Sequence, residues 1–152
     1  MGERGYFEIG IYHTKSALNV GTLWRSAYQL GAAGIFTIGK RYRQQGSDTL
    51  KTWRHVPLRE FPSLDTWYDA LPYNALVVGV EMGGKALQDF IHPARAVYLL
   101  GAEDRGLSPQ ALARCHQVVS LDALRTASYN VAVAGSLVMY HRFVQHNVRL
   151  GE

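Results

Sequence analysis

The stretch AVYLLGAEDRGLSPQALARC, residues 96–115, combines a strand, a glycine-bearing loop and a helix in immediate succession. It begins with an almost continuous apolar run, which is typical of a strand that is covered on both faces of its sheet. Gly101 and Gly106 lie in the following loop. Ser108 then precedes Pro109, and this pairing of an N-cap residue with a proline at the first helical position predicts a helix start. The stretch therefore predicts one strand–loop–helix unit of an α/β fold.

The same alternation continues on both sides of this unit. Four more apolar runs predict strands, namely YFEIGIY (6–12), GIFTIG (34–39), ALVVGV (75–80) and QVVSL (117–121). A helix is predicted over residues 19–30, where Gly31 ends it, and another begins after the N-cap candidate Ser63. A last helix is predicted over residues 130–147, after the final strand. This order predicts an α/β fold with a mainly parallel sheet flanked by helices. In such sheets ligand sites collect at the carboxyl ends of the strands.

Composition narrows the class of protein. The chain has 152 residues, 47% of them apolar and 18% charged, which predicts one globular domain over residues 1–152. A net charge of +4 permits a polyanionic partner without requiring one. The single cysteine, Cys115, favours a reducing compartment, and the predicted location is the cytoplasm. The apolar runs are too short for a membrane span, and the scattered histidines do not predict a metal site.

The predicted last helix contains VAVAGSLVMY, residues 131–140, and is apolar almost all round. A surface helix of a small domain normally carries one polar face. The run therefore predicts a homodimer interface, with burial inside the monomer as the alternative reading.

Three loops follow predicted strands and carry glycines or polar residues. They are EMGGKAL (81–87), GAEDRGLS (101–108) and DALRTASYN (122–130). Glycines in such loops allow close approach of the backbone to a ligand, although each loop alone also reads as a simple turn. Neither a G-x-G-x-x-G sequence after the first strand nor a G-x-x-x-x-G-K-[ST] sequence occurs, so these dinucleotide- and nucleotide-binding signatures are excluded.

Three segments resemble, in order and separation, the three motifs of the SpoU/TrmH branch of the SPOUT RNA methyltransferases. They are NVGTLWRSA (19–27), LLGAEDRGLS (99–108) and SYNVAVAGSLVMY (128–140). The resemblance implies a deep trefoil knot in the C-terminal part, at about residues 75–147, an exception to the rule of unknotted chains. It also implies a homodimer packed through the first and last helices, with an active site that spans both subunits. The implied reaction transfers a methyl group from S-adenosylmethionine to a ribose 2′-hydroxyl of RNA and leaves S-adenosylhomocysteine.

The same resemblance implies which residues take part in catalysis. Arg25 matches the arginine of the first motif, which either activates the ribose hydroxyl or binds the adjacent phosphate as a bidentate partner. Asn19, Glu103, Ser128 and Asn130 are the other catalytic candidates. For Asn19, Ser128 and Asn130, helix capping is the alternative role, and for Glu103 it is that of a solvated loop charge.

A second set of positions matches the backbone that lines the cofactor pocket in the family. These are Val80, Gly101, Leu121, Ser128 and Tyr129. The chain departs from the family pattern at two places, since Tyr129 stands where leucine or methionine is usual and Asp122 where proline is common. The departures bear on the shape of the pocket.

The segment KRYRQQGSDTLKTWRHVP, residues 40–57, is basic and rich in aromatic residues. Basic groups can contact phosphates and aromatic rings can stack on unpaired bases, so this segment is the predicted RNA-binding surface. Its RNA-binding candidates are Arg41, Arg43, Lys51, Trp53 and Arg54. The expected substrate is tRNA, with rRNA as the alternative. Two other functions stay open, a non-catalytic RNA-binding module with the same fold and a flavodoxin-like or Rossmann-like binder of small molecules.

Overall fold

The structure is a computed structural model that describes residues 5–14, 16–39, 55–102, 105–126 and 128–150, with the backbone alone at residues 148–150. Its strands are β1 (Tyr6–Tyr12), β2 (Gly34–Ile38), β3 (Leu58–Phe61), β4 (Leu76–Ala86), β5 (Arg95–Gly101) and β6 (Gln117–Ser120). The helices are α1 (Ala17–Leu30), α2 (Leu64–Asp69), α3 (Pro109–Ala113) and α4 (Val131–Leu150), and the 3₁₀ turn η2 spans Leu87–Asp89.

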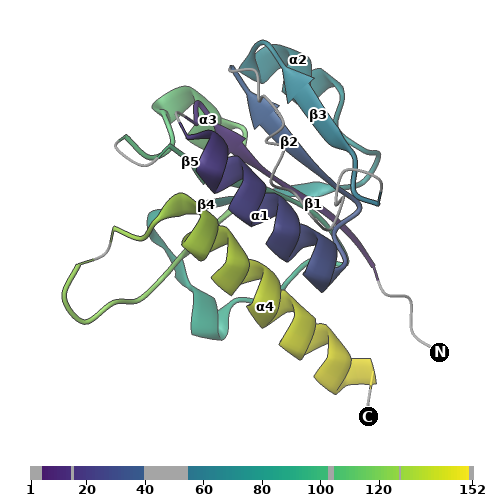
Figure 1. The fold of residues 1–152 in the computed structure, drawn as a ribbon. Coiled ribbons are helices and arrows are strands. Elements are labelled where there is room, and N and C mark those ends of the chain that lie inside the picture. Colours follow the sequence, from purple (N-terminus) through teal and green to yellow (C-terminus); the bar gives the residue numbers. More distant parts are fainter. Residues whose placement is uncertain (1–4, 15, 40–54, 103–104, 127, 151–152) are drawn as a thin grey trace.

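The strands form one six-stranded sheet in the order β3-β2-β1-β5-β4-β6, and all five pairings are parallel (Figure 1). The α/β class and the parallel sheet predicted from the sequence are therefore confirmed. All five predicted strands occur. The sheet contains one more strand, β3, at its edge, and β4 runs on through residues 81–86, which the sequence predicted as loop. A register shift between Val80 and Lys85 lets this extension pair with β6.

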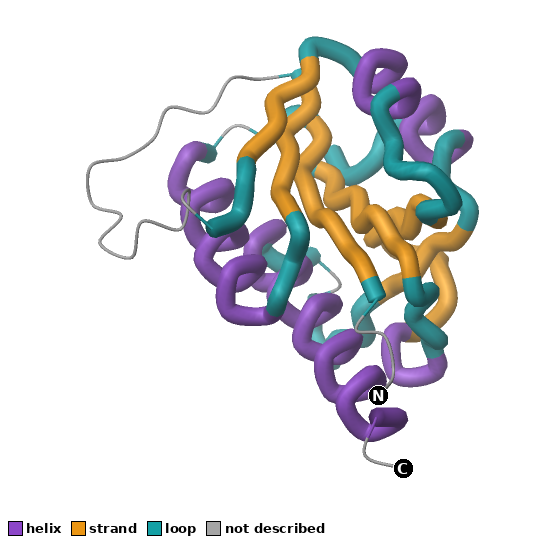
Figure 2. Tube along the Cα trace, turned by 90° about the vertical axis from the view of Figure 1, so that its right-hand side faces the viewer, coloured by secondary structure: helices purple, strands orange, loops and turns teal. Residues whose placement is uncertain are grey.

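Helices cover both faces of the sheet (Figure 2). Because side chains alternate along a strand, β5 serves both layers. Tyr98 and Leu100 pack in the core beneath α1 and α4, whereas Val97 and Leu99 pack in the core beneath α2 and α3. The helices α1 and α4 lie side by side on their face of the sheet (Figure 1). All four β5 residues are buried, which explains the continuous apolar run in the sequence.

Capping residues mark the helix starts. Ser63 and Ser108 cap α2 and α3 as predicted, each accepting a hydrogen bond from the backbone three residues on. Gly31 ends α1 in the left-handed conformation, also as predicted. The start of α1 differs from the prediction, because Ser16 is the N-cap and accepts a hydrogen bond from the amide of Asn19. Asn19 is therefore inside the helix, and its side chain is released for other contacts.

Helix α4 has two apolar faces of different character. Val138 and Met139 are fully buried against α1 and the sheet. The opposite face exposes a row of large apolar side chains, namely Val133, Leu137, Tyr140, Phe143 and Val144. The helix is thus partly buried within the monomer and still leaves an apolar stripe uncovered. No helix in the described part of the chain is long and apolar enough to cross a membrane.

Candidate functional site

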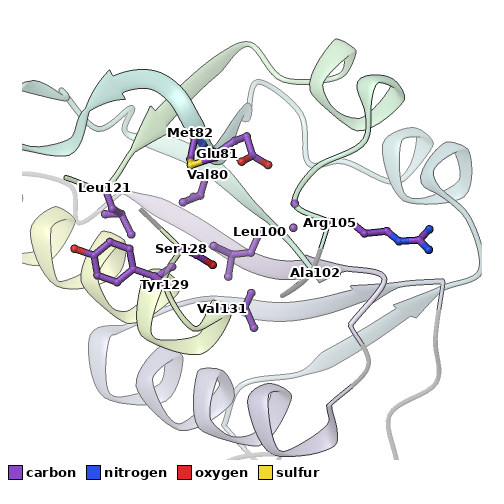
Figure 3. Close-up of a pocket in the computed structure, with 13 residues that line it drawn as sticks. Val80, Glu81, Met82, Leu100, Ala102, Arg105, Leu121, Ser128, Tyr129 and Val131 are labelled. Atoms are coloured by element: carbon purple, nitrogen blue, oxygen red, sulfur yellow. Dashed lines mark hydrogen bonds between the residues drawn. The ribbon is translucent and has the colours of Figure 1, made fainter. Parts of the chain in front are cut away.

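A cleft of about 280 Å³ lies where three loops meet at the carboxyl ends of β4, β5 and β6 (Figure 3). We call it the three-loop cleft. It is lined by residues 80–82 within β4, by residues 100–102 at the end of β5 with Arg105 and Gly106 in the loop that follows, and by Leu121, Ser128, Tyr129, Val131 and Ala134 at the last loop and α4. The structure thus brings together all five positions predicted for the cofactor pocket, Val80, Gly101, Leu121, Ser128 and Tyr129. Their role in binding stays a prediction.

Glu81 is a cleft residue that sequence reasoning missed. Its Oε2 accepts a hydrogen bond from the Leu107 amide at 2.7 Å, and its Oε1 accepts one from the Met82 amide at 2.9 Å. The half-buried carboxylate therefore joins the extended part of β4 to the loop after β5. The available signal was its place, since Glu81 is a charged residue directly after a buried apolar run at the ligand-binding edge of the sheet.

Gly101 allows two segments of its own loop to approach each other, whereas the sequence predicted a close approach of the backbone to a ligand. A Cβ atom at this position would lie 2.3 Å from the carbonyl carbon of Gly106 and 2.6 Å from the amide nitrogen of Leu107. Ala102 and Gly106 are joined by a backbone hydrogen bond of 3.0 Å. The glycine therefore lets the loop close on itself, and a side chain at residue 101 would distort the loop before it met a ligand.

The two departures from the family pattern contact each other. The hydroxyl of Tyr129 donates a hydrogen bond of 2.5 Å to the backbone carbonyl of Asp122. This bond ties the end of the last loop to its beginning. The phenol at position 129 thus stabilises one shape of the loop that closes the three-loop cleft.

Asn130 both caps α4 and contacts α1. Its Oδ1 accepts hydrogen bonds from the amides of Ala132 and Val133 at 2.9 and 3.1 Å, as an N-cap residue does. Its Nδ2 donates to Oδ1 of Asn19 at 3.1 Å. The two asparagines of the first and third motifs, 111 residues apart in the sequence, therefore meet beside the cleft.

Arg25 does not reach the three-loop cleft of its own chain. Its side chain is exposed on α1 and is absent from the lining of the cleft. Six residues separate it from Asn19, which places it about 240° further round the helix axis. The other catalytic candidate, Glu103, lies outside the described residues, as do the RNA-binding candidates Arg41, Arg43, Lys51, Trp53 and Arg54.

The strongest pKa shifts lie at the amino end of β5, away from the cleft. His92 Nδ1 is 2.7 Å from the Tyr98 hydroxyl, and His92 Nε2 is 2.8 Å from Nδ1 of His141. Burial, with smaller contributions from His141, Arg142 and His146, lowers the pKa of His92 to about 3. Burial raises the pKa of Tyr98 to about 12. Both groups are therefore neutral at physiological pH and serve the packing of α4.

Neither a reactive cysteine nor a set of metal ligands occurs among the described residues. Burial raises the pKa of the Cys115 thiol to about 11, so this cysteine is protonated and is a poor nucleophile. Within the described residues, no group of three or more His, Cys, Asp or Glu side chains could hold a metal ion. Among the described residues that line the three-loop cleft, Glu81, Arg105 and Ser128 carry charged or hydroxyl side chains.

Several solved structures that superpose on this chain are described as methyltransferases. The SpoU methyltransferase AviRb from Streptomyces viridochromogenes, solved with AdoMet, superposes with a TM-score of 0.81 at 23% identity over 97% of this chain and 60% of that one. The TrmH/SpoU tRNA modifying enzyme of A. aeolicus gives 0.84 at 14% identity over 97% of this chain and 78% of that one. A structure reported for the 2-OH methylation of C/U34 on tRNA gives 0.82 at 26% identity, covering 97% of this chain and 100% of that one.

The family model of the SpoU rRNA methylases matches residues 6–140. The chain therefore belongs to the SpoU rRNA methylase family, and this membership excludes the flavodoxin-like or Rossmann-like alternative. It is also 28% identical over 134 residues to an uncharacterized tRNA/rRNA methyltransferase of Mycobacterium bovis, and it spans 40% of that protein's length. Family membership also implies the C-terminal knot predicted for about residues 75–147.

Proposed function

We propose that this chain is an S-adenosylmethionine-dependent methyltransferase that modifies a ribose 2′-hydroxyl of RNA, with residues 1–152 forming its single catalytic domain. The observation that carries the proposal is the meeting of three strand ends in one cleft. The positions contributed by the second and third motifs line this cleft, and the first motif reaches its edge through Asn19. Family membership supports the same reaction.

The three-loop cleft fits the chemistry of the cofactor. Its aliphatic walls, formed by Val80, Leu100, Leu121 and Val131, suit an adenine ring. The carboxylate of Glu81 lies at the same cleft and suits a ligand that carries a cationic sulfonium and an ammonium group. The volume of about 280 Å³ is close to the lower limit for small-molecule pockets, so a compact cofactor conformation is expected. When bound, the cofactor supplies the methyl group, and S-adenosylhomocysteine remains.

The position of Arg25 favours an active site that two subunits share. Arg25 is exposed and lies outside its own cleft. The apolar stripe of α4, beside α1, offers a surface on which a second copy can pack. In a homodimer built on this stripe, Arg25 of one subunit serves the cleft of the other, where its planar guanidinium orients the ribose through the adjacent phosphate or assists removal of the hydroxyl proton. Asn19 and Asn130 hold the start of α1 against the start of α4, and Ser128 lines the cleft.

We propose tRNA as the substrate. A chain of matching length, aligned over 97% of this chain and all of its own, was solved for the 2-OH methylation of C/U34 on tRNA. The basic segment 40–57, which carries the RNA-binding candidates, supplies phosphate contacts and stacking surfaces.

The test uses the purified protein, labelled S-adenosylmethionine and RNA from cells that lack the protein. We expect label in the tRNA fraction, recovered as a 2′-O-methylated nucleotide, and unchanged transfer when EDTA is added. Label in rRNA alone would contradict the tRNA substrate. Cofactor binding without transfer to any cellular RNA would favour the non-catalytic RNA-binding module.

A further inference from the structure

A second cleft, of about 610 Å³, lies beside the three-loop cleft at the carboxyl ends of β1 and β5. We call it the β1–β5 cleft. Its lining includes Tyr12 at the end of β1, His13 and Thr14 after β1, Gly39 after β2, and Arg105 and Ser108 after β5. Its volume lies within the range of pockets that hold small organic ligands. It shares Ala102, Arg105 and Gly106 with the three-loop cleft, but it contains none of the five positions predicted for the cofactor pocket.

The connections of the sheet explain why a cleft opens here. β1 and β5 are neighbours in the sheet. After β1 the chain enters α1, which covers one face, and after β5 it enters α3, which covers the other face. The two connections therefore part at this point, and the crevice outside the carboxyl ends of such strands is the usual ligand site of an open parallel sheet.

The lining of the β1–β5 cleft offers aromatic rings and hydrogen-bonding groups together. The rings of Tyr12 and His13 have centroids 4.1 Å apart at 66° to each other. His13 is held in the left-handed region with φ at 58°, an arrangement that occurs preferentially at functional sites when the residue is not glycine. Gly39 accommodates it, since a Cβ at residue 39 would lie 2.7 Å from the His13 ring. The backbone thus places an exposed imidazole at the cleft.

Polar groups complete the lining. Thr14, Ser108 and Arg105 belong to the same cleft. The Thr14 hydroxyl already bonds to the backbone of Ser16, whereas the Ser108 hydroxyl, which accepts the capping bond of α3, keeps its proton for a ligand. Arg105 lies on the wall that both clefts share, and its side chain extends away from the other residues of the three-loop cleft (Figure 3). An aromatic pair, hydroxyls and one cation are the groups that bind the base, sugar and phosphate of an unpaired nucleotide.

We propose that the β1–β5 cleft binds the target nucleotide of the RNA, with its base against His13 and Tyr12 and its phosphate beside Arg105. The inference rests on the proposed function and adds to it the site that selects the base. The shared wall of Ala102, Arg105 and Gly106 places this nucleotide next to the three-loop cleft. Stacking on aromatic side chains is the usual way in which proteins hold an unstacked RNA base.

The experiment titrates the full chain, saturated with S-adenosylhomocysteine, with the four nucleosides and their 5′-monophosphates, followed by NMR of the histidine ring protons and by calorimetry. We expect saturable shifts of the His13 signals and a preference for one base. His13→Asn keeps a residue that tolerates the left-handed backbone but removes the ring, and it should weaken the preferred nucleoside and its monophosphate alike by about tenfold. Arg105→Gln should weaken the monophosphate and leave the nucleoside unchanged.

Tyr73→Ala is the matched control, because this aromatic side chain is 85% exposed and lies outside both clefts. It should leave every affinity unchanged, and His13→Asn, which changes no residue of the three-loop cleft, should bind S-adenosylhomocysteine like the wild type. Unshifted His13 signals, or equal nucleotide affinity of His13→Asn and the wild type, would overturn the inference while the cofactor still binds. A wild-type chain that fails to bind S-adenosylhomocysteine would overturn the proposed function itself.

Discussion

Single hydrogen-bonding side chains hold the loops of the three-loop cleft in place. Glu81 joins β4 to the loop after β5 through the amides of Met82 and Leu107. Tyr129 closes the third loop on the carbonyl of Asp122. Charged acceptors such as Glu81 form the stronger of these bonds, and removal leaves two amides without their partner. We therefore expect cofactor binding to depend on side chains that order the backbone as much as on those that touch the ligand.

Glu81→Ala should weaken S-adenosylhomocysteine binding by about tenfold or more, because the loop after β5 loses its anchor to β4. The free energy of unfolding should fall by about 1–3 kcal/mol, the range for removing a hydrogen-bonded buried acceptor. Calorimetry and urea denaturation measure the two effects. Glu60→Ala, at an exposed position on β3, is the control and should change neither. Wild-type affinity of Glu81→Ala would show that the loop keeps its shape without the carboxylate.

Arg25→Ala should leave stability and cofactor affinity nearly unchanged, since the side chain is exposed and outside its own cleft. Methyl transfer should fall by at least about a hundredfold, the scale for losing one positioned acid–base or charge-stabilising group. Arg25→Lys should not restore it, because an ammonium group lacks the planar fork of a guanidinium. Single-turnover transfer of labelled methyl measures the loss. Thr22→Ala, exposed on the same helix, should transfer normally.

The buried His92 predicts how stability depends on pH. Arg142 donates a hydrogen bond to the Tyr98 hydroxyl, which keeps its own proton and therefore donates to Nδ1 of His92. Nε2 of His92 then carries the proton and donates to His141. The pKa of His92 is about 3 in the folded chain against 6.5 without the fold, and His146 adds to this lowering. Between these values the unfolded chain binds a proton that the folded chain does not, so stability is lost as pH falls below about 6.5.

The expected contribution of this one group is at most about 1.4 kcal/mol per pH unit. Urea denaturation of the wild type, of His92→Gln and of His55→Gln at several values between pH 4 and pH 7 separates it from the other titrating groups. His92→Gln should have the flatter profile, and His55→Gln, at an exposed position, should follow the wild type. Parallel profiles for all three proteins would assign the acid sensitivity to other residues.

Among the elements, those with a strong local pattern could be predicted from the sequence. Strands β1 and β5 are apolar except for Glu8 and Arg95 because helices cover both faces, and α3 begins at its Ser108 and Pro109 signal. β3 was missed because an edge strand with two exposed charged residues, Arg59 and Glu60, carries no apolar run. The extension of β4 was missed because its glycines favour a loop until pairing with β6 makes it a strand.

In the candidate site, too, some features could be predicted from the sequence and others could not. The positions that line the three-loop cleft could be predicted because the motifs place them at strand ends. The hydrogen bond of Glu81 could not, since its partner Leu107 is 26 residues away and only the fold brings β4 and the loop after β5 together. The same holds for the contact between Asn19 and Asn130 and for the β1–β5 cleft, where His13 meets Gly39 across neighbouring strands. Contacts made across the sheet leave no local signal.

The exposed apolar stripe of α4 leads to a prediction about the oligomeric state. Leu137 is 43% exposed in the monomer, so Leu137→Arg should fold normally. It should nevertheless split the dimer, because an unpaired charge in an apolar interface costs several kcal/mol. Sedimentation equilibrium at micromolar concentration, together with a thermal melt, measures both. Tyr73→Arg, at another exposed position, should stay dimeric. A wild-type chain that is monomeric in this experiment would remove the proposed interface.

In the whole molecule, one edge of the sheet carries both clefts, and one helix layer carries the proposed interface. The three-loop cleft lies at the ends of β4, β5 and β6, and the β1–β5 cleft lies at the next strand boundary. They share the wall around Arg105. With both proposed ligands bound, the methyl donor and the acceptor nucleotide would approach from adjacent pockets whose separation is fixed by the parallel sheet.

Helix α4 has one further consequence. Val131 and Ala134 line the three-loop cleft, while Val133 and Leu137 belong to the uncovered stripe of the same helix turns. We therefore expect a ligand that steadies this end of α4 to favour the proposed homodimer, and in that case dimer formation favours the ligand by an equal free energy. The affinity for S-adenosylhomocysteine should weaken on dilution of the protein, and Leu137→Arg should abolish that dependence. The apparent affinity of each molecule for the cofactor should then rise with the concentration of the protein.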